Sequence, residues 1–208
     1  PTAEYLEKKD EGQEDENNKY KAIPYGNRTS STYSISKTSR AVIDATDPVY
    51  YMSAAETEYL LAECYARLGD KGNAKTHYDD AVELSFARWN HGDKAAEFTA
   101  NGGLYEFQDA DEESMLKCIL TQKWIASTRC QAWDAWFDIN RTGIPEVSEK
   151  TTDDATYVLG TLAYNLNSSL AKGQFAHRFI YSKESLDYNT NAPTKVPAIT
   201  EPLWWHKK

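Results

Sequence analysis

The fold is decided by residues 53–87, which read SAAETEYLLAECYARLGDKGNAKTHYDDAVELSFA. Ser53 followed three residues later by Glu56 has the spacing of a capping box, so we expect a helix to begin there. Apolar residues then recur at steps of three and four, which predicts a buried stripe made of Leu61, Cys64, Tyr65 and Leu68. The turn at 69–72 ends this helix, and Asn73 can cap the next one.

The second helix of this pair carries an apolar stripe of its own: Ala74, Tyr78, Ala81, Val82, Ser85 and Phe86. A turn this short makes the two helices antiparallel neighbours, and the small side chains of Ala62, Ala74 and Ala81 allow them to approach closely. The Leu-Gly turn and the Ala…Tyr…Ala spacing resemble a tetratricopeptide unit. Because the chain shows no second copy at that period, and one unit cannot bury its own apolar face, other helices must pack against it.

A long third helix is predicted after the acidic residues 111–113, which suit a helix N-terminus. Its broad apolar stripe is Met115, Leu116, Ile119, Leu120, Trp124 and Ile125. We expect a bend near Cys130, then continuation to Gly143 and Pro145, which end the helix. Within the second half, Trp133, Trp136 and Phe137 are interpreted as core anchors, and Asp138 and Arg141 as an intrahelical ion pair.

These elements indicate one domain of the mainly α class, with tetratricopeptide-like hairpins in an α–α superhelix and long irregular arms. Residues 1–48 form an irregular arm with a short strand expected near 33–35. Residues 53–145 form the helical core. Residues 146–208 form a short helix, expected at 153–170, and an extended tail.

Composition excludes several classes of protein. The 208 residues include 23 Lys and Arg against 32 Asp and Glu, a net charge of −9 that disfavours binding of nucleic acid. No stretch approaches the roughly 18–20 apolar residues of a membrane span. The opening residues PTAEYLEKKD carry neither an export signal nor a lipidation cysteine, so no anchor is expected in this chain.

The cysteines and histidines show no catalytic or metal-binding pattern. Cys118 and Cys130 would lie about 18 Å apart on a continuous helix, too far for a disulfide. With Cys64 they are interpreted as small buried hydrophobic residues, and no spacing suggests zinc. The four histidines are scattered, and we interpret His77 as a surface or packing residue. We expect no catalytic residue, no metal and no cofactor.

Two pairs of acidic residues leave a hydrolytic function open. Asp109 with Glu112, or Asp153 with Asp154, are the carboxylates that a glycoside hydrolase could use. Both pairs stand where helices are expected to start, so capping explains them without catalysis. The same acids could hold calcium, but neither pair follows the spacing of a dedicated calcium loop.

Aromatic residues are abundant, with 6 Trp, 14 Tyr and 6 Phe. Trp89, Tyr105 and Phe107 lie in residues 88–110, a segment that contains Gly92, Gly102 and Gly103. Rings presented on loops can stack on flat apolar faces of ligands, including sugar rings. These three residues are therefore the candidate glycan-binding residues.

Several segments resemble, in order, the SusD/RagB family of outer-membrane nutrient-binding lipoproteins. The main segment is QKWIA at 122–126 followed by QAWDAWFDINRTGIP at 131–145. The helix segment ETEYLLAEC at 56–64 and the tail segments RFIY at 178–181 and WW at 204–205 are similar to further family elements. The resemblance covers the chain from about residue 50 to its end, which corresponds to a C-terminal portion of family members.

The resemblance implies a cell-surface protein that binds polysaccharide or oligosaccharide without catalysis. Family members cap a SusC-like TonB-dependent transporter at the extracellular face of the outer membrane, and the full-length protein would be anchored by lipid. The alternative function is a tetratricopeptide-like module that binds a protein or peptide. A glycoside hydrolase ranks third.

Overall fold

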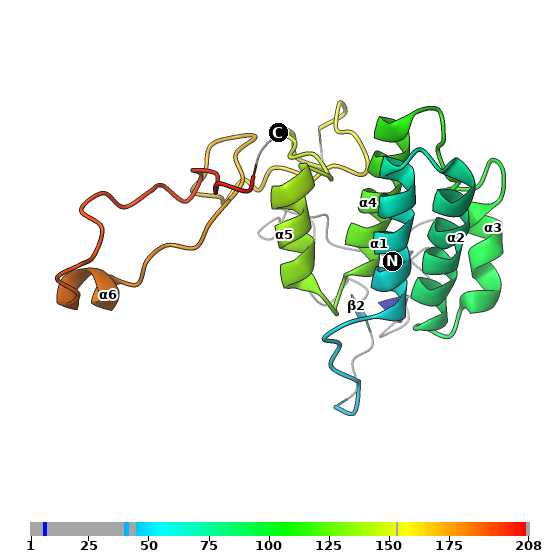
Figure 1. Cartoon of the computed structure of the whole chain (residues 1–208), viewed down its shortest axis with the longest axis horizontal. Coiled ribbons are helices and arrows are strands. Elements are labelled where there is room, and N and C mark those ends of the chain that lie inside the picture. Colours follow the sequence, from blue (N-terminus) through cyan, green and yellow to red (C-terminus); the bar gives the residue numbers. More distant parts are fainter. Residues whose placement is uncertain (1–5, 8–39, 42–44, 153, 207–208) are drawn as a thin grey trace.

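The computed structural model describes residues 6–7, 40–41, 45–152 and 154–206, and it is mainly helical, as the sequence predicts (Figure 1). The elements in chain order are β1 (Leu6–Glu7), β2 (Arg40–Ala41), α1 (Ala54–Arg67), α2 (Lys71–Ala87), the short 3-10 helix η3 (Gly92–Lys94), α3 (Ala95–Thr99), α4 (Glu112–Ala126), α5 (Ala132–Thr142) and α6 (Lys183–Tyr188). β1 and β2 pair antiparallel. The strand expected at 33–35 lies outside the described residues.

The α1–α2 hairpin forms where the sequence places it. Ser53 caps α1, since its side-chain oxygen accepts a hydrogen bond of 3.1 Å from the backbone N–H of Glu56. The prediction that Asn73 caps α2 is wrong, because α2 begins at Lys71 and its cap is Asp70. The Asp70 carboxylate accepts hydrogen bonds from both the backbone and the side chain of Asn73, so Asn73 supports the cap from inside the first turn.

The buried face of α1 is not the stripe of leucines that the sequence suggested. Leu61, Cys64 and Leu68 are exposed and Tyr65 is only partly buried, whereas the buried apolar residues are Ala55, Tyr59, Ala62 and Ala66. The physical reason is that α1 packs against both α2 and α4. A face of alanines lets two helices approach closely, which a leucine stripe would prevent.

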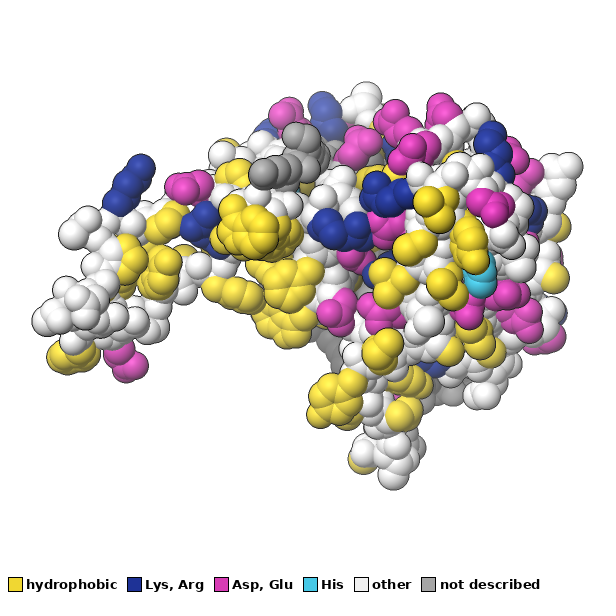
Figure 2. Space-filling view, in the orientation of Figure 1, with side chains coloured by type: hydrophobic (Ala, Val, Ile, Leu, Met, Phe, Trp, Pro, Cys, Tyr) yellow, Lys and Arg dark blue, Asp and Glu magenta, His cyan; other side chains and the backbone are white. Residues whose placement is uncertain are grey.

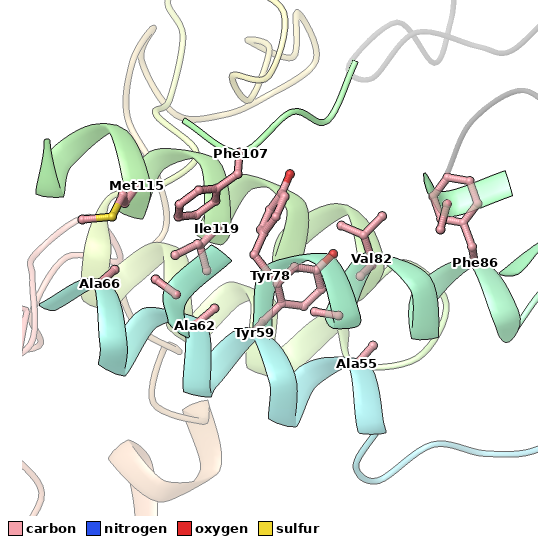
Figure 3. Close-up of a cluster of buried hydrophobic side chains, with 14 residues drawn as sticks. Ala55, Tyr59, Ala62, Ala66, Tyr78, Val82, Phe86, Phe107, Met115 and Ile119 are labelled. Carbon is pink, nitrogen blue, oxygen red and sulfur yellow. The ribbon is translucent and has the colours of Figure 1, made fainter. Parts of the chain in front are cut away.

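The core lies between α1, α2 and α4 (Figure 3). The stripe predicted for α2 is confirmed, with Ser85 half-buried and the other members buried. Tyr59 and Tyr78 meet edge to face with ring centroids 6.3 Å apart. From α4, Met115 and Ile119 close the cluster, and the close approach through Ala62, Ala74 and Ala81 is confirmed because all three are fully buried.

The long third helix expected from the sequence is broken into α4 and α5 at residues 127–131. Arg129 has a positive φ of 65°, which interrupts the helix. Arg88, at the end of α2, donates hydrogen bonds to the carbonyl of Ala126 and to the Cys130 sulfur, and so fixes the break. Gly143 ends α5 in the left-handed conformation, as predicted.

Ionic contacts attach α5 to α1 and α4. Glu63, on the buried side of α1, accepts two hydrogen bonds of 2.7 and 2.8 Å from Arg141 of α5. Lys123 of α4 lies 2.5 Å from Asp138, which also pairs with Arg141 at 2.9 Å, so the predicted ion pair is confirmed. We call the four residues Glu63, Lys123, Asp138 and Arg141 the α5 clamp.

The helix predicted at 153–170 is wrong. The described residues of this segment form turns, and Leu162 exchanges backbone hydrogen bonds with residues 146 and 148. Asp154 accepts a hydrogen bond from the backbone N–H of Thr156, which favours a local turn over a helix, and Gly160 has a φ of 85°. A short helix, α6, instead interrupts the tail that was expected to be extended.

The three cysteines are free thiols, as expected, but Cys64 is exposed and the other two are half-buried. Burial raises the pKa of the Cys118 and Cys130 thiols above the ordinary value. Among the described helices, none is long and apolar enough to cross a membrane.

Candidate functional site

The three aromatic residues singled out in the sequence do not form one exposed platform. Phe107 is only 6% exposed and its ring packs against Tyr78 at 5.3 Å, so the expectation of a solvent-presented ring is wrong for this residue. Tyr105 is partly buried, with its ring 5.4 Å from Phe98 and 6.3 Å from Phe86. Phe107 therefore belongs to the core, and Tyr105 packs against its border.

The loop that carries Tyr105 and Phe107 turns inward because Gly103 allows its backbone to lie close to the backbone of α3. The backbone N–H of Tyr105 donates to the Phe98 carbonyl at 2.8 Å. A side chain at Gly103 would place its Cβ only 2.4 Å from the same carbonyl oxygen, so only glycine fits. The loop thus folds back over α2 and α3, a result that the residue types alone did not reveal.

Trp89 lines a small cavity between α2 and α4 together with Tyr105, and Phe107 is not part of that lining. Trp89 is half-buried immediately after α2, and the guanidinium groups of Arg88 and Arg129 lie 5.9 and 5.6 Å from its ring centroid. These distances are typical of cation–π contacts. A role of Trp89 in glycan binding stays a prediction.

Exposed aromatic rings gather instead on α5 and the tail. Trp133 is 62% exposed, Phe137 44% and Phe179 62%. Trp136 and Trp205 are partly buried among them. We call these five residues the aromatic surface, and Figure 2 shows the corresponding hydrophobic side chains massed between the helical body and the tail.

Ring-to-ring contacts make the aromatic surface continuous. The ring centroid of Phe179 lies 5.3 Å from that of Trp133 and 5.2 Å from that of Trp136. Phe137 touches Trp136 at 5.0 Å and Trp205 at 6.5 Å. The interpretation of Trp133, Trp136 and Phe137 as core anchors is therefore wrong, since their main partners are tail residues more than 30 positions away in the sequence.

Local sequence explains how the rings come to share one face. Trp136 and Phe137 lie three and four residues after Trp133, which places both beside it on one face of α5. The α5 clamp engages Asp138 and Arg141 toward α1 and α4, so the helix is held by its polar residues and its rings are left outside. The indole N–H of Trp136 donates to the Ala176 carbonyl at 3.0 Å and so fastens the tail.

A cavity of about 570 Å³ lies beside the aromatic surface, at the C-terminal end of α5. Its polar lining includes Glu146, His177 and His206, and Phe175 adds an aromatic wall. The rings of His177 and His206 are 4.5 Å apart, and His206 is also in ring contact with Trp205. The cavity has the size of a small-molecule site.

The polar groups of this cavity are well placed by buried residues. Asn140 is 1% exposed, and its side-chain oxygen lies 2.6 Å from Nδ1 of His177. The Asn140 amide donates to the Trp136 carbonyl at 2.9 Å, which fixes its orientation. Nδ1 of His206 is buried and finds no hydrogen-bond partner among the described residues.

The carboxylates considered for hydrolysis lie where α4 and a local turn begin. Asp109 and Glu112 are exposed at the start of α4, where the cap is Asp111. Hydrogen bonds from Ser114 lower the pKa of Asp111, and bonds from Thr156 lower that of Asp154. Asp153 lies outside the described residues.

Two features of the sequence relate to the aromatic surface on α5. The aromatic tail segments at 178–181 and 204–205 had been noted, but nothing in their spacing indicated contact with α5. The second feature was the acidic Glu63 within an otherwise apolar helix segment. A buried acid requires a cationic partner, and this partner, Arg141, orients α5.

Comparison with known protein families agrees with the resemblance in the sequence. The sequence model of the SusD-like family, described as starch-binding and associating with the outer membrane, matches residues 2–164. The match includes all helices from α1 to α5 and extends further toward the N-terminus than the resemblance did, while the tail segments lie beyond it. No individual curated protein matches the chain. The chain belongs to the SusD-like family, a family of carbohydrate-binding proteins associated with the outer membrane.

Proposed function

We propose that this chain captures glycans on its aromatic surface and in the adjoining cavity, without chemical turnover. The family description supplies the ligand class, starch-like carbohydrate. The observation that carries the choice of site is the exposure of Trp133, Phe137 and Phe179 in one continuous ring cluster. Large apolar surfaces of this kind usually mark a binding site in a soluble domain.

The chemistry of the site suits a sugar. A pyranose ring has apolar C–H faces that stack on an indole or phenyl ring and exclude water from both partners. Its hydroxyl groups need hydrogen-bond partners, because an unpaired buried polar group costs about 1–3 kcal/mol. The side chains of Glu146, His177 and His206 supply such partners within the cavity.

The proposal includes the destination of the glycan. The chain would pass bound oligosaccharide to a SusC-like TonB-dependent transporter at the extracellular face of the outer membrane, with the full-length protein held there by a lipid anchor. Single stacking contacts are weak, so contact with a transporter or with several sugar units would add avidity.

Binding of soluble starch, measured by affinity electrophoresis or calorimetry, tests the site. We expect Trp133→Ala to weaken binding at least tenfold, because aromatic anchors at the centre of an interface are worth about 2 kcal/mol or more. Tyr188→Ala is the matched control, since Tyr188 is 85% exposed on α6 and lies outside the aromatic surface. Its affinity should be unchanged.

The variant Trp89→Ala distinguishes between the aromatic surface and the loop after α2 as the position of the glycan site. If Trp89→Ala abolishes binding and Trp133→Ala does not, the site lies at the loop after α2 and the aromatic surface is not the glycan site. If neither the wild-type chain nor the variants bind any member of a panel of soluble polysaccharides at millimolar sugar, glycan capture itself is rejected.

The interaction module remains the second candidate because α1 exposes leucines on its outer side. Leu60 and Leu61 are about two-fifths exposed and Leu68 is 79% exposed. Capture of a purified SusC-like transporter by the wild-type chain should be reduced by the double variant Leu61→Glu and Leu68→Glu, while starch binding is retained. Equal capture by both chains would exclude this face as the protein contact.

A further inference from the structure

We infer that the α1–α2 hairpin binds one zinc ion through Glu58, His77 and Asp80. One ligand atom from each of these residues lies within 4.8 Å of the other two. Nδ1 of His77 and a carboxylate oxygen of Glu58 are already 2.6 Å apart. The sequence alone does not indicate this metal site, because the three residues are separated by up to 22 positions and show no recognisable spacing.

The hairpin brings the three side chains together. His77 and Asp80 lie on α2 at a spacing of three residues, so they occupy neighbouring turns of one face. Glu58 reaches them from α1, which runs antiparallel beside α2. The site is thus built on two packed helices, which hold ligands more firmly than loops do.

The distances fit a small divalent ion. Zinc binds histidine nitrogen and carboxylate oxygen at about 2.0–2.1 Å, so two ligand atoms at a tetrahedral angle stand about 3.3 Å apart. The contact of 2.6 Å between His77 and Glu58 would therefore open by less than 1 Å, and a pair of ligand atoms at the 4.8 Å limit would close by about 1.5 Å.

The surroundings hold the histidine ring in place. Tyr65 stacks on the His77 ring with centroids 5.2 Å apart and planes inclined by only 4°. The side chains of His77 and Glu58 are 24% and 25% exposed, which limits competition from water. Asp80 is exposed and keeps one side of the site open for entry of the ion.

The donor set selects the metal. One imidazole and two carboxylates match the nitrogen and oxygen ligands of zinc, and two ionised acids balance its charge. Calcium prefers six to eight oxygen ligands, which this group does not offer. The three protein ligands leave a fourth position to water, and the bound ion would join α1 to α2 by coordination bonds.

Zinc titration of the untagged chain tests the site, with calorimetry and thermal unfolding as independent measurements. We expect one ion per chain and a melting temperature that rises with zinc concentration. Asp80→Asn and His77→Gln should each weaken zinc binding at least tenfold. His91→Gln, a change of another half-buried histidine outside the cluster, should leave it unaltered.

The titration distinguishes a zinc site from the absence of one. Asp80 is exposed, so its variant keeps the fold even if a change at His77 does not. Absence of zinc binding by the wild-type chain, or zinc binding that both variants retain in full, overturns the inference. A response to calcium as strong as the response to zinc would likewise reject it, because the site would then be a non-selective acidic patch.

Discussion

Replacing Tyr78 by alanine is expected to lower the free energy of unfolding by about 3–5 kcal/mol, the range found when a large buried aromatic side chain is truncated. Tyr78 is fully buried at the centre of the core and touches Tyr59 and Phe107. Its hydroxyl also donates to the Tyr105 carbonyl at 2.8 Å. Urea unfolding followed by circular dichroism would measure the change.

Tyr78→Phe is the matched control for this prediction. It keeps the ring and removes only the hydroxyl, so the expected loss is about 1 kcal/mol, the usual net value of one hydrogen bond. The structure thus predicts a large difference between the two variants. Equal losses would mean that the hydrogen bond, and not ring packing, accounts for the role of this residue.

Replacing Glu63 by glutamine is expected to lower the free energy of unfolding by about 2 kcal/mol, less than the roughly 3–5 kcal/mol typical of a fully buried ion pair. The Glu63 side chain is only 6% exposed, but its partners Arg67 and Arg141 are 46% and 40% exposed and can turn to water when the carboxylate is lost. Glu83→Gln, at an exposed position of α2, should change stability by less than 0.5 kcal/mol in either direction, roughly the limit for surface substitutions.

The pH dependence of this effect follows from the pKa of Glu63. Burial acts to raise that pKa, but hydrogen bonds and charge from Arg141 and Arg67 outweigh burial and hold it below the ordinary value of 4.5. A carboxyl with a lowered pKa stabilises the fold above its unfolded pKa and loses that contribution as the pH falls through its folded pKa. The difference between wild type and Glu63→Gln should therefore be full at pH 6 and shrink below about pH 4.5. A difference that grows on acidification would contradict the assignment.

The sequence predicted the helical class and the hairpin because both depend on local signals. The cap at Ser53, the stripe of α2 and the stop at Gly143 are encoded within a few residues of where they act. The buried face of α1 was missed because this helix carries both a stripe of leucines and a stripe of alanines. Only contact with α2 and α4 together selects the alanines as the buried stripe. The break before α5 was expected only as a bend, since it depends on Arg88 from another helix.

For the candidate site, the sequence indicated the class of ligand but not the location. Abundant aromatic residues and the family resemblance pointed to sugar binding, and that part did not need coordinates. The location depends on contacts between residues far apart in the chain, such as Phe179 on Trp133 and Trp205 on Phe137. Periodicity assigned the rings of α5 to the core because an apolar face on a helix is normally buried. It gave no indication that ion pairs would attach the opposite side of α5 to α1 and α4.

The attachment of α5 through Glu63, Lys123, Asp138 and Arg141 separates two tasks along a single short helix. The residues of this clamp are different from the two most exposed rings of α5, Trp133 and Phe137. On the proposed function, we expect exchange of Trp133 or Phe137 for other side chains to alter which carbohydrate is preferred, with little change in the melting temperature. On the proposed function, α5 is therefore a position at which related proteins can differ in the polysaccharide that they bind, and at which this chain can be redesigned to bind a new one.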